Sequence, residues 1–160
     1  MSLQYELCFL KPFKNLAHET LLNIVVTGTL LVKEGHRILL PFGITEAQFN
    51  VLMLLKHQTE NGRMNQTMLG KMLLVNRSNV TGLIDRMEQV GWVRRTVDTG
   101  DRRVNQVKIT ESGHEILERA QKEYYTRIEE IMSVLSPEER EYLCRTLESV
   151  REQIYINQKM

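Results

Sequence analysis

Short polar side chains are gathered at the start of a predicted helix over residues 76–90. At about 100° per residue, one side of this helix is apolar, whereas Ser78 and Thr81 lie on the opposite side. Arg77 and Asn79 flank them. A helix that enters the major groove of DNA needs short leading residues that carry donors and acceptors for base edges. The pattern therefore predicts a DNA recognition helix.

Two other residues on the polar side of this helix, Gly82 and Asp85, need an explanation. A glycine within a helix costs about 1 kcal/mol relative to alanine. Either Gly82 allows close approach to DNA, or it lies beneath a neighbouring side chain, and the sequence favours neither interpretation. Asp85 would repel phosphate, so we expect it one turn further from the groove, where it orients Arg86.

A predicted β-hairpin follows the helix. Residues 92–97 and 104–109 have the composition of strands, and a polar turn at residues 98–101 joins them. Arginine on a protruding ribbon suits the narrow minor groove beside a major-groove helix. Arg102 and Arg103 directly follow the turn, and Asp101 is expected to pair with one of them while the other reaches DNA. In the first strand, Arg94 or Arg95 is expected to contact phosphate.

The rest of the chain must position this segment, and its pattern is mainly helical. Further helices are predicted over residues 15–38, 46–60 and 65–74, after Thr110, and from Pro137 onwards. Only two or three residues separate the helix over 65–74 from the one that Asn76 caps, which makes the pair a helix-turn-helix. The predicted fold is mainly α with a small β-hairpin wing. The predicted helix starts have capping residues at Thr45, Asn65, Asn76, Thr110 and Ser136, and Gly91 is placed to end the helix that Asn76 begins.

The composition indicates a globular chain of one domain. Hydrophobic residues make up 42% and charged residues 26% of the 160 residues, and the net charge is +1. The charge is uneven: residues 76–109 hold seven Lys or Arg and four Asp or Glu (+3), whereas residues 110–160 hold seven and eleven (−4). This asymmetry fits a DNA-contacting centre. We find no secretory signal and no apolar run near the ~20 residues of a membrane span, so we expect no membrane partner and a cytoplasmic location.

Five segments of the sequence resemble the MarR family of winged helix-turn-helix transcriptional regulators. They follow one another in the family's order and at its usual spacings, and together they cover about residues 44–113. The segments are ITEAQF (44–49), NRSNVTGLIDRME (76–88), GWVRR (91–95), DRR (101–103) and ITESG (109–113).

The resemblance implies a homodimer that binds double-stranded DNA at a pseudopalindromic operator. Residues 1–43 and 111–160 would form the helical dimerisation region, and residues 44–110 the winged helix-turn-helix. Carried over by position, Ser78, Asn79 and Thr81 read the groove. Arg77 and Arg86 would lie near phosphate, and Arg102 or Arg103 would contact DNA from the tip of the wing. Such proteins are often repressors that a small anionic or phenolic ligand, or oxidation, releases.

The resemblance also raises two candidate sensing sites. Cys8 stands where a peroxide-responsive branch of the family has a sensing cysteine, but the tyrosines of that branch are absent from the first predicted helix. An effector pocket is expected where the helices over 15–38, from Glu46 and after Thr110 meet the DNA-binding lobe, with His36 and Arg37 nearby.

Cys144, between apolar helix positions, is expected to be a small buried residue. The sequence implies no cofactor.

Other classes of function have little support in the sequence. The four histidines stand apart, without His-x3-His or Cys-x2-Cys pairing, so no metal site is expected. No nucleophile elbow or phosphate-binding loop is present, so no catalytic residues are expected and an enzyme is disfavoured. A winged helix used for protein association is the alternative, but it would need an apolar recognition face.

Overall fold

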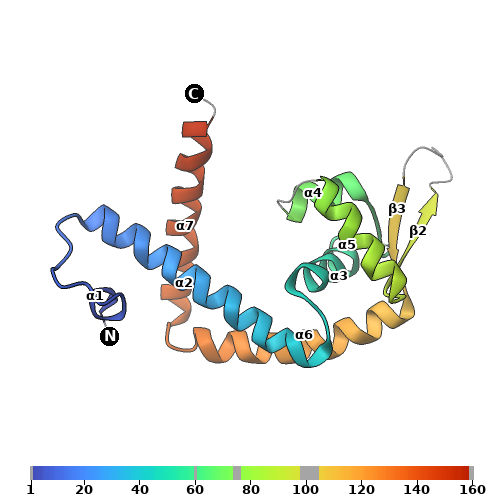
Figure 1. Cartoon of the computed structure of the whole chain (residues 1–160), viewed down its shortest axis with the longest axis horizontal. Coiled ribbons are helices and arrows are strands. Elements are labelled where there is room, and N and C mark those ends of the chain that lie inside the picture. Colours follow the sequence, from blue (N-terminus) through green and yellow to red (C-terminus); the bar gives the residue numbers. More distant parts are fainter. Residues whose placement is uncertain (1, 60, 74–76, 98–104, 159–160) are drawn as a thin grey trace. The chain divides into compact units, whose positions relative to one another are not determined.

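A computed structural model describes residues 2–59, 61–73, 77–97 and 105–158. The chain divides into two compact units, Met1–Ala120 and Gln121–Met160, with the boundary inside one long helix (Figure 1). Mostly helical structure with a small antiparallel sheet confirms the predicted fold class. The elements are α1 (Leu3–Glu6), α2 (Leu16–Leu39), the 3₁₀ helix η1 (Leu40–Phe42), α3 (Glu46–His57), β1 (Arg63–Asn65), α4 (Gln66–Leu73), α5 (Arg77–Gln89), β2 (Val93–Val97), β3 (Asn105–Ile109), α6 (Glu111–Met132) and α7 (Pro137–Gln158).

The predicted capping residues account for where most helices begin. Thr45 and Gln48 form a reciprocal capping box at the start of α3. The side chain of Asn65 accepts from the amide of Met68 in α4 (2.7 Å), and that of Thr110 accepts from the amide of Gly113 in α6 (3.1 Å). The α7 box pairs Ser136 with Glu139 in both directions. The predicted cap Asn76 lies outside the described residues.

The wing contains a strand that the sequence did not predict. Three strands form an antiparallel sheet in the order β1-β3-β2, with Met64 of β1 opposite Val107 of β3. Three residues are too few to show the alternation of apolar and polar side chains that predicts a strand. β1 forms only because β3, far along the chain, offers it a hydrogen-bonding edge.

The core of the first unit lies between α3, α4, α5 and one face of the sheet. α3 buries Phe49, Leu52 and Leu55, while the sheet contributes Val93 and Val107. The buried side of α5 agrees with the predicted apolar side, except that Val90 is exposed. On α4, Met72 is exposed, whereas Leu69 is buried.

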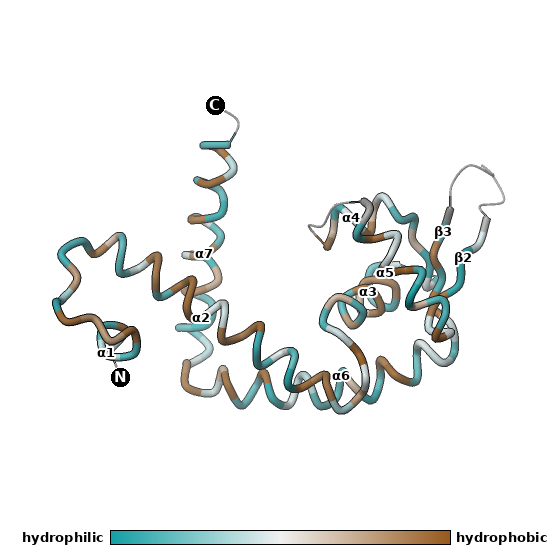
Figure 2. Tube along the Cα trace, in the orientation of Figure 1, coloured by the Kyte–Doolittle hydropathy of each residue, from teal (hydrophilic) through white to brown (hydrophobic). Residues whose placement is uncertain are grey.

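Several helices bear apolar side chains that their own unit leaves uncovered. On α2, Leu16 and Leu30 remain 77% and 54% exposed, and brown stretches recur along the α2 tube in Figure 2. α7 buries none of its described residues, so Cys144 is exposed and the expectation that it is buried is wrong. Within the second unit, Arg140 pairs with Glu129 (2.6 Å) and so connects α7 to α6.

No single helix among the described residues is long and apolar enough to cross a membrane. The segments Leu16–Phe42 and Glu46–His57 meet the length and composition test only when taken together, and they are bent by 80°. The core helix of a folded domain passes the same test, and the second segment is α3, which supplies Phe49 and Leu52 to the core.

Candidate nucleic-acid interface

α5 presents a polar surface on the side away from the core. Val80 and Ile84 are buried, whereas Asn79, Thr81 and Arg86 are exposed. This division follows from the helical period, because the apolar positions recur at steps of three and four residues. The structure therefore brings three of the predicted DNA-contacting residues to one accessible surface. For Arg77 and Ser78 it describes the backbone alone, and Asn76, Asp101, Arg102 and Arg103 lie outside the described residues.

Gly82 lies on this polar surface without crowding from the described residues. A Cβ at this position would meet only the Nη1 atom of Arg86, at 3.6 Å, which is ordinary van der Waals contact with the end of a flexible side chain. The alternative that Gly82 lies beneath a packed neighbour finds no support in this geometry. A glycine that the fold does not require is consistent with close approach of a partner.

An arginine clamp fixes α5 to the wing, and we use that name for Arg95 with its two acidic partners. The guanidinium of Arg95 donates to Asp85 and Glu88, both on α5, while the backbone amide of Arg95 donates to Glu88 Oε1 (2.7 Å). Burial lowers the pKa of Arg95, but hydrogen bonds and charges of the two carboxylates outweigh it, so the pKa is raised overall. The clamp thus holds the second half of α5 against β2.

The clamp corrects one sequence-based expectation and bears on another. Asp85 was expected to orient Arg86, but its carboxylate instead pairs with Arg95. Either Arg94 or Arg95 was expected to contact phosphate, and the guanidinium of Arg95 already has two carboxylate partners. The partner that was missed is Glu88, which lies one turn after Asp85 on the same helix. Alternation along β2 could have indicated this, because it places Arg95 on the same face as the apolar Val93.

The base of the wing is joined tightly to α6. Gly91 has the left-handed φ of 80° that the sequence predicted. The amide of Thr110 donates to the carbonyl of Trp92 (3.1 Å), and the hydroxyl of Thr110 donates to the carbonyl of Gly91 (2.6 Å). A Cβ at Gly113 would lie 2.1 Å from the Trp92 carbonyl oxygen, so only glycine fits there. These contacts set the position of the hairpin relative to the start of α6.

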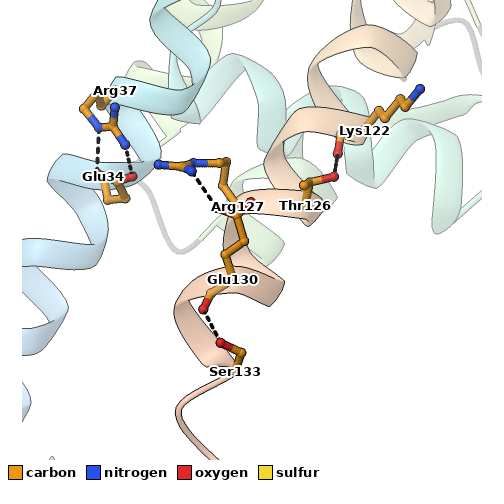
Figure 3. Close-up of polar contacts among 7 residues, drawn as sticks. All are labelled: Glu34, Arg37, Lys122, Thr126, Arg127, Glu130 and Ser133. Atoms are coloured by element: carbon orange, nitrogen blue, oxygen red, sulfur yellow. Dashed lines mark hydrogen bonds and ion pairs between the residues drawn. The ribbon is translucent and has the colours of Figure 1, made fainter.

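The residues proposed for effector binding lie in the last turn of α2. His36 and Arg37 are both exposed, and Arg37 donates to the two carboxylate oxygens of Glu34 at 2.8 and 2.5 Å (Figure 3). The hydrogen bond and the charge of Glu34 raise the pKa of Arg37. A pocket of about 230 Å³ is lined by Glu46, Ala47, Asn50, Leu73 and Leu83, and neither His36 nor Arg37 contributes to it.

Cys8 lies in the N-terminal segment that follows α1. It is exposed and has a φ of 55°. The rings of Phe9 and Phe13, which are close to Cys8 in sequence, contact each other in a tilted arrangement, with centroids 5.3 Å apart. In the part of the chain that the structure describes, no group of three or more His, Cys, Asp or Glu side chains could hold a metal ion.

Comparison with known proteins identifies the family. The model of the MarR family matches residues 44–104. The chain is 32% identical to the transcriptional regulator MhqR of Bacillus subtilis over 108 residues, which are 68% of this chain and 72% of MhqR. It is 31% identical to the transcriptional repressor MprA of Escherichia coli K12 over 113 residues, covering 71% of this chain and 64% of MprA.

A solved structure shares most of the fold. Sco3205 of Streptomyces coelicolor, a MarR-family regulator crystallised in complex with DNA, aligns with a TM-score of 0.79 and 26% identity. The alignment covers 89% of this chain and 91% of Sco3205. These matches, on a fold that has a helix-turn-helix and a wing, show that this chain belongs to the MarR family of transcriptional regulators.

Proposed function

We propose that this regulator binds double-stranded DNA sequence-specifically through α5 and the wing. The observation that carries the proposal is the accessible surface formed by Asn79, Thr81 and the uncrowded Gly82. Short donors and acceptors on a helix that the core supports from behind are suited to base edges in the major groove. Arg86 extends from the same surface and would contact phosphate. The further proposed contacts are Asn76, Arg77 and Ser78 in the helix, and Asp101, Arg102 and Arg103 in the wing.

The two strand arginines have different parts in this proposal. Arg95 supports DNA binding indirectly, because the arginine clamp orients α5. Arg94 lies on the other face of the sheet and is not needed for the proposed contacts. The wing therefore contributes through its tip, while its base positions the helix.

Binding to DNA from upstream of the protein's own gene would test this proposal. Fluorescence anisotropy at ~0.1 M salt should show sequence-preferring binding that weakens steeply as salt increases, because Lys and Arg displace counterions from phosphate. Asn79→Ala should reduce discrimination at one base pair by about tenfold. Gln89→Ala, at the far end of α5, is the matched control and should leave discrimination unchanged. Binding with no preference for sequence would contradict the proposal.

We further propose that the protein acts as a homodimer on a pseudopalindromic operator. The uncovered apolar side chains of α2 and α7, among them Leu30 and Ile154, support a partner surface on the helices outside residues 44–110. Light scattering should give twice the chain mass of 18.7 kDa. Ile154→Glu should shift the protein towards monomer, whereas Gln153→Glu, one residue away, should not. A monomer in the unaltered protein would exclude recognition of two half-sites by one molecule.

The regulatory part of the proposal is a cytoplasmic, non-enzymatic repressor that a small aromatic or anionic molecule releases. Similarity to MprA, which is named as a repressor, supports the direction of regulation. The proposed effector contacts are His36 and Arg37. Arg37 would bind the effector after its ion pair with Glu34 has broken. A thermal-shift screen with aromatic acids such as benzoate, followed by anisotropy with any acid that raises the melting temperature, tests the idea. An acid that stabilises the protein without changing DNA affinity would argue against it.

A further inference from the structure

The outer face of the wing sheet carries a row of three cations. Lys108 of β3 is directly opposite Arg63 of β1 on one side and Arg94 of β2 on the other. Residues directly opposite one another in antiparallel strands share a face, with Cβ atoms about 5 Å apart. Like charges at this spacing destabilise a sheet. We call Arg63, Lys108 and Arg94 the cationic row.

The cationic row borders a pocket of about 570 Å³ in the first unit. Lys56 from the last turn of α3 and Thr59 just after that helix line it, as do Glu111 and His114 from the first turn of α6. Arg94 and Lys108 contribute from the sheet, so three cations and one carboxylate face the pocket, which leaves two positive charges uncompensated. Ile109 is the single aliphatic side chain among the lining residues, and the other lining residues supply polar side chains, backbone or the alkyl stems of the cations.

The cations have no partner in the part of the chain that the structure describes. Every described ion pair of the wing involves Arg95, on the opposite face, and none involves Lys56 or a member of the cationic row. A fold that places three like charges in one row without a carboxylate to neutralise them retains an electrostatic repulsion, which a bound anion would relieve.

We propose that this pocket binds a small dianion, either a phosphate monoester or a compact dicarboxylate. The two uncompensated charges match a ligand charge near −2, and the lysine and arginine donors suit phosphate or carboxylate oxygens. A pocket of polar lining favours a charged ligand over an aromatic one. The site lies on the face of the sheet opposite α5, so a duplex bound by α5 would have to bend around the sheet to reach it.

Binding can be measured directly with two simple probes. Inorganic phosphate and malonate represent the two chemical sources, and each is titrated into the whole protein by calorimetry at ~0.1 M salt. Trp92, the only tryptophan, lies two residues before Arg94 and offers a fluorescence readout. We expect saturable binding of at least one probe, and at least tenfold weaker binding by Arg94→Gln with Lys108→Gln, as expected for loss of charge-assisted hydrogen bonds.

Two further variants make the result decisive. Arg119→Gln with Lys122→Gln removes the same charge from exposed positions of α6 outside the pocket, and its binding should stay within about twofold of the original. Lys56→Gln with His114→Gln removes lining groups from helices and leaves the sheet intact, so it tests the pocket if the sheet variant fails to fold. Weakening in this variant supports the proposal, and unchanged binding contradicts it.

The proposal stands apart from DNA binding, so each can fail alone. Equal binding of phosphate and malonate by the original protein, the sheet variant and the control would overturn the dianion site, as would the absence of saturation. A sheet variant that binds both probes normally and loses affinity for duplex DNA would also overturn it, because the cationic row would then contact the DNA backbone. Failure of Asn79→Ala to affect base preference would leave the dianion site unaffected.

Discussion

Arg94 and Arg95 are neighbours in β2, yet their surroundings are opposite. Arg95 faces α5 and is bound by Asp85 and Glu88, whereas Arg94 faces outward beside Lys108 and has no carboxylate partner among the described residues. The period of two along a strand is sufficient to produce this difference. A cationic residue is therefore informative only together with its partners: the inner arginine organises the fold, and the outer one is available to a ligand.

The largest expected effect comes from a change at the junction between the base of the wing and α6, which positions both faces of the sheet. Gly113→Ala should destabilise the protein by about 3 kcal/mol, because its Cβ would lie 2.1 Å from the Trp92 carbonyl and would force the wing base away from α6. Urea unfolding measures the change. A loss below about 0.5 kcal/mol, the usual size for surface substitutions, would mean that the junction can move without strain.

Removing the inner arginine should have the next largest effect. Arg95→Gln should reduce the free energy of unfolding by about 1 kcal/mol, a small value because its partners are partly exposed. It should also leave Asp85 and Glu88 to repel each other one turn apart. Adding Glu88→Gln should recover part of the loss, while Arg94→Gln is the matched control. Equal losses for Arg94→Gln and Arg95→Gln would remove the contrast between the two faces.

Gly82→Ala separates stability from recognition on the helix that the clamp holds. Because the position is uncrowded among the described residues, alanine should stabilise the protein by about 1 kcal/mol through helix propensity. If DNA approaches closely there, the same change should weaken operator binding. Thermal unfolding and anisotropy on one preparation measure both. Higher stability with unchanged DNA affinity would show that no close contact forms at Gly82.

The smallest effect is expected on the outer face. Lys108→Gln removes the central charge of the cationic row and should raise the free energy of unfolding by a few tenths of a kcal/mol at low salt. The gain should shrink as salt screens the repulsion. Unfolding at two salt concentrations, with Lys71→Gln on α4 as a control, checks this. A loss of stability would indicate that Lys108 has a partner and that the row is not repulsive.

Local signals predicted the helices and their starts, whereas partners across the fold were not predicted. The capping boxes at Thr45 and Ser136 depend on residues three positions apart, so they are visible in the sequence. β1 and the arginine clamp depend on elements that meet only in the folded chain. Asp85 and Arg95 are ten residues apart on a helix and a strand, so no local spacing connects them.

The crowded carbonyl of Trp92 also limits how the length of this chain can change. It accepts the amide of Thr110 and contacts the site where a Cβ of Gly113 would lie. One residue inserted between Thr110 and Gly113 would turn the start of α6 by about 100°, and a side chain would then lie where only hydrogen fits. Insertions and deletions among homologous sequences should therefore be absent between Ile109 and Gly113, which makes this short segment a fixed reference point for aligning diverged relatives.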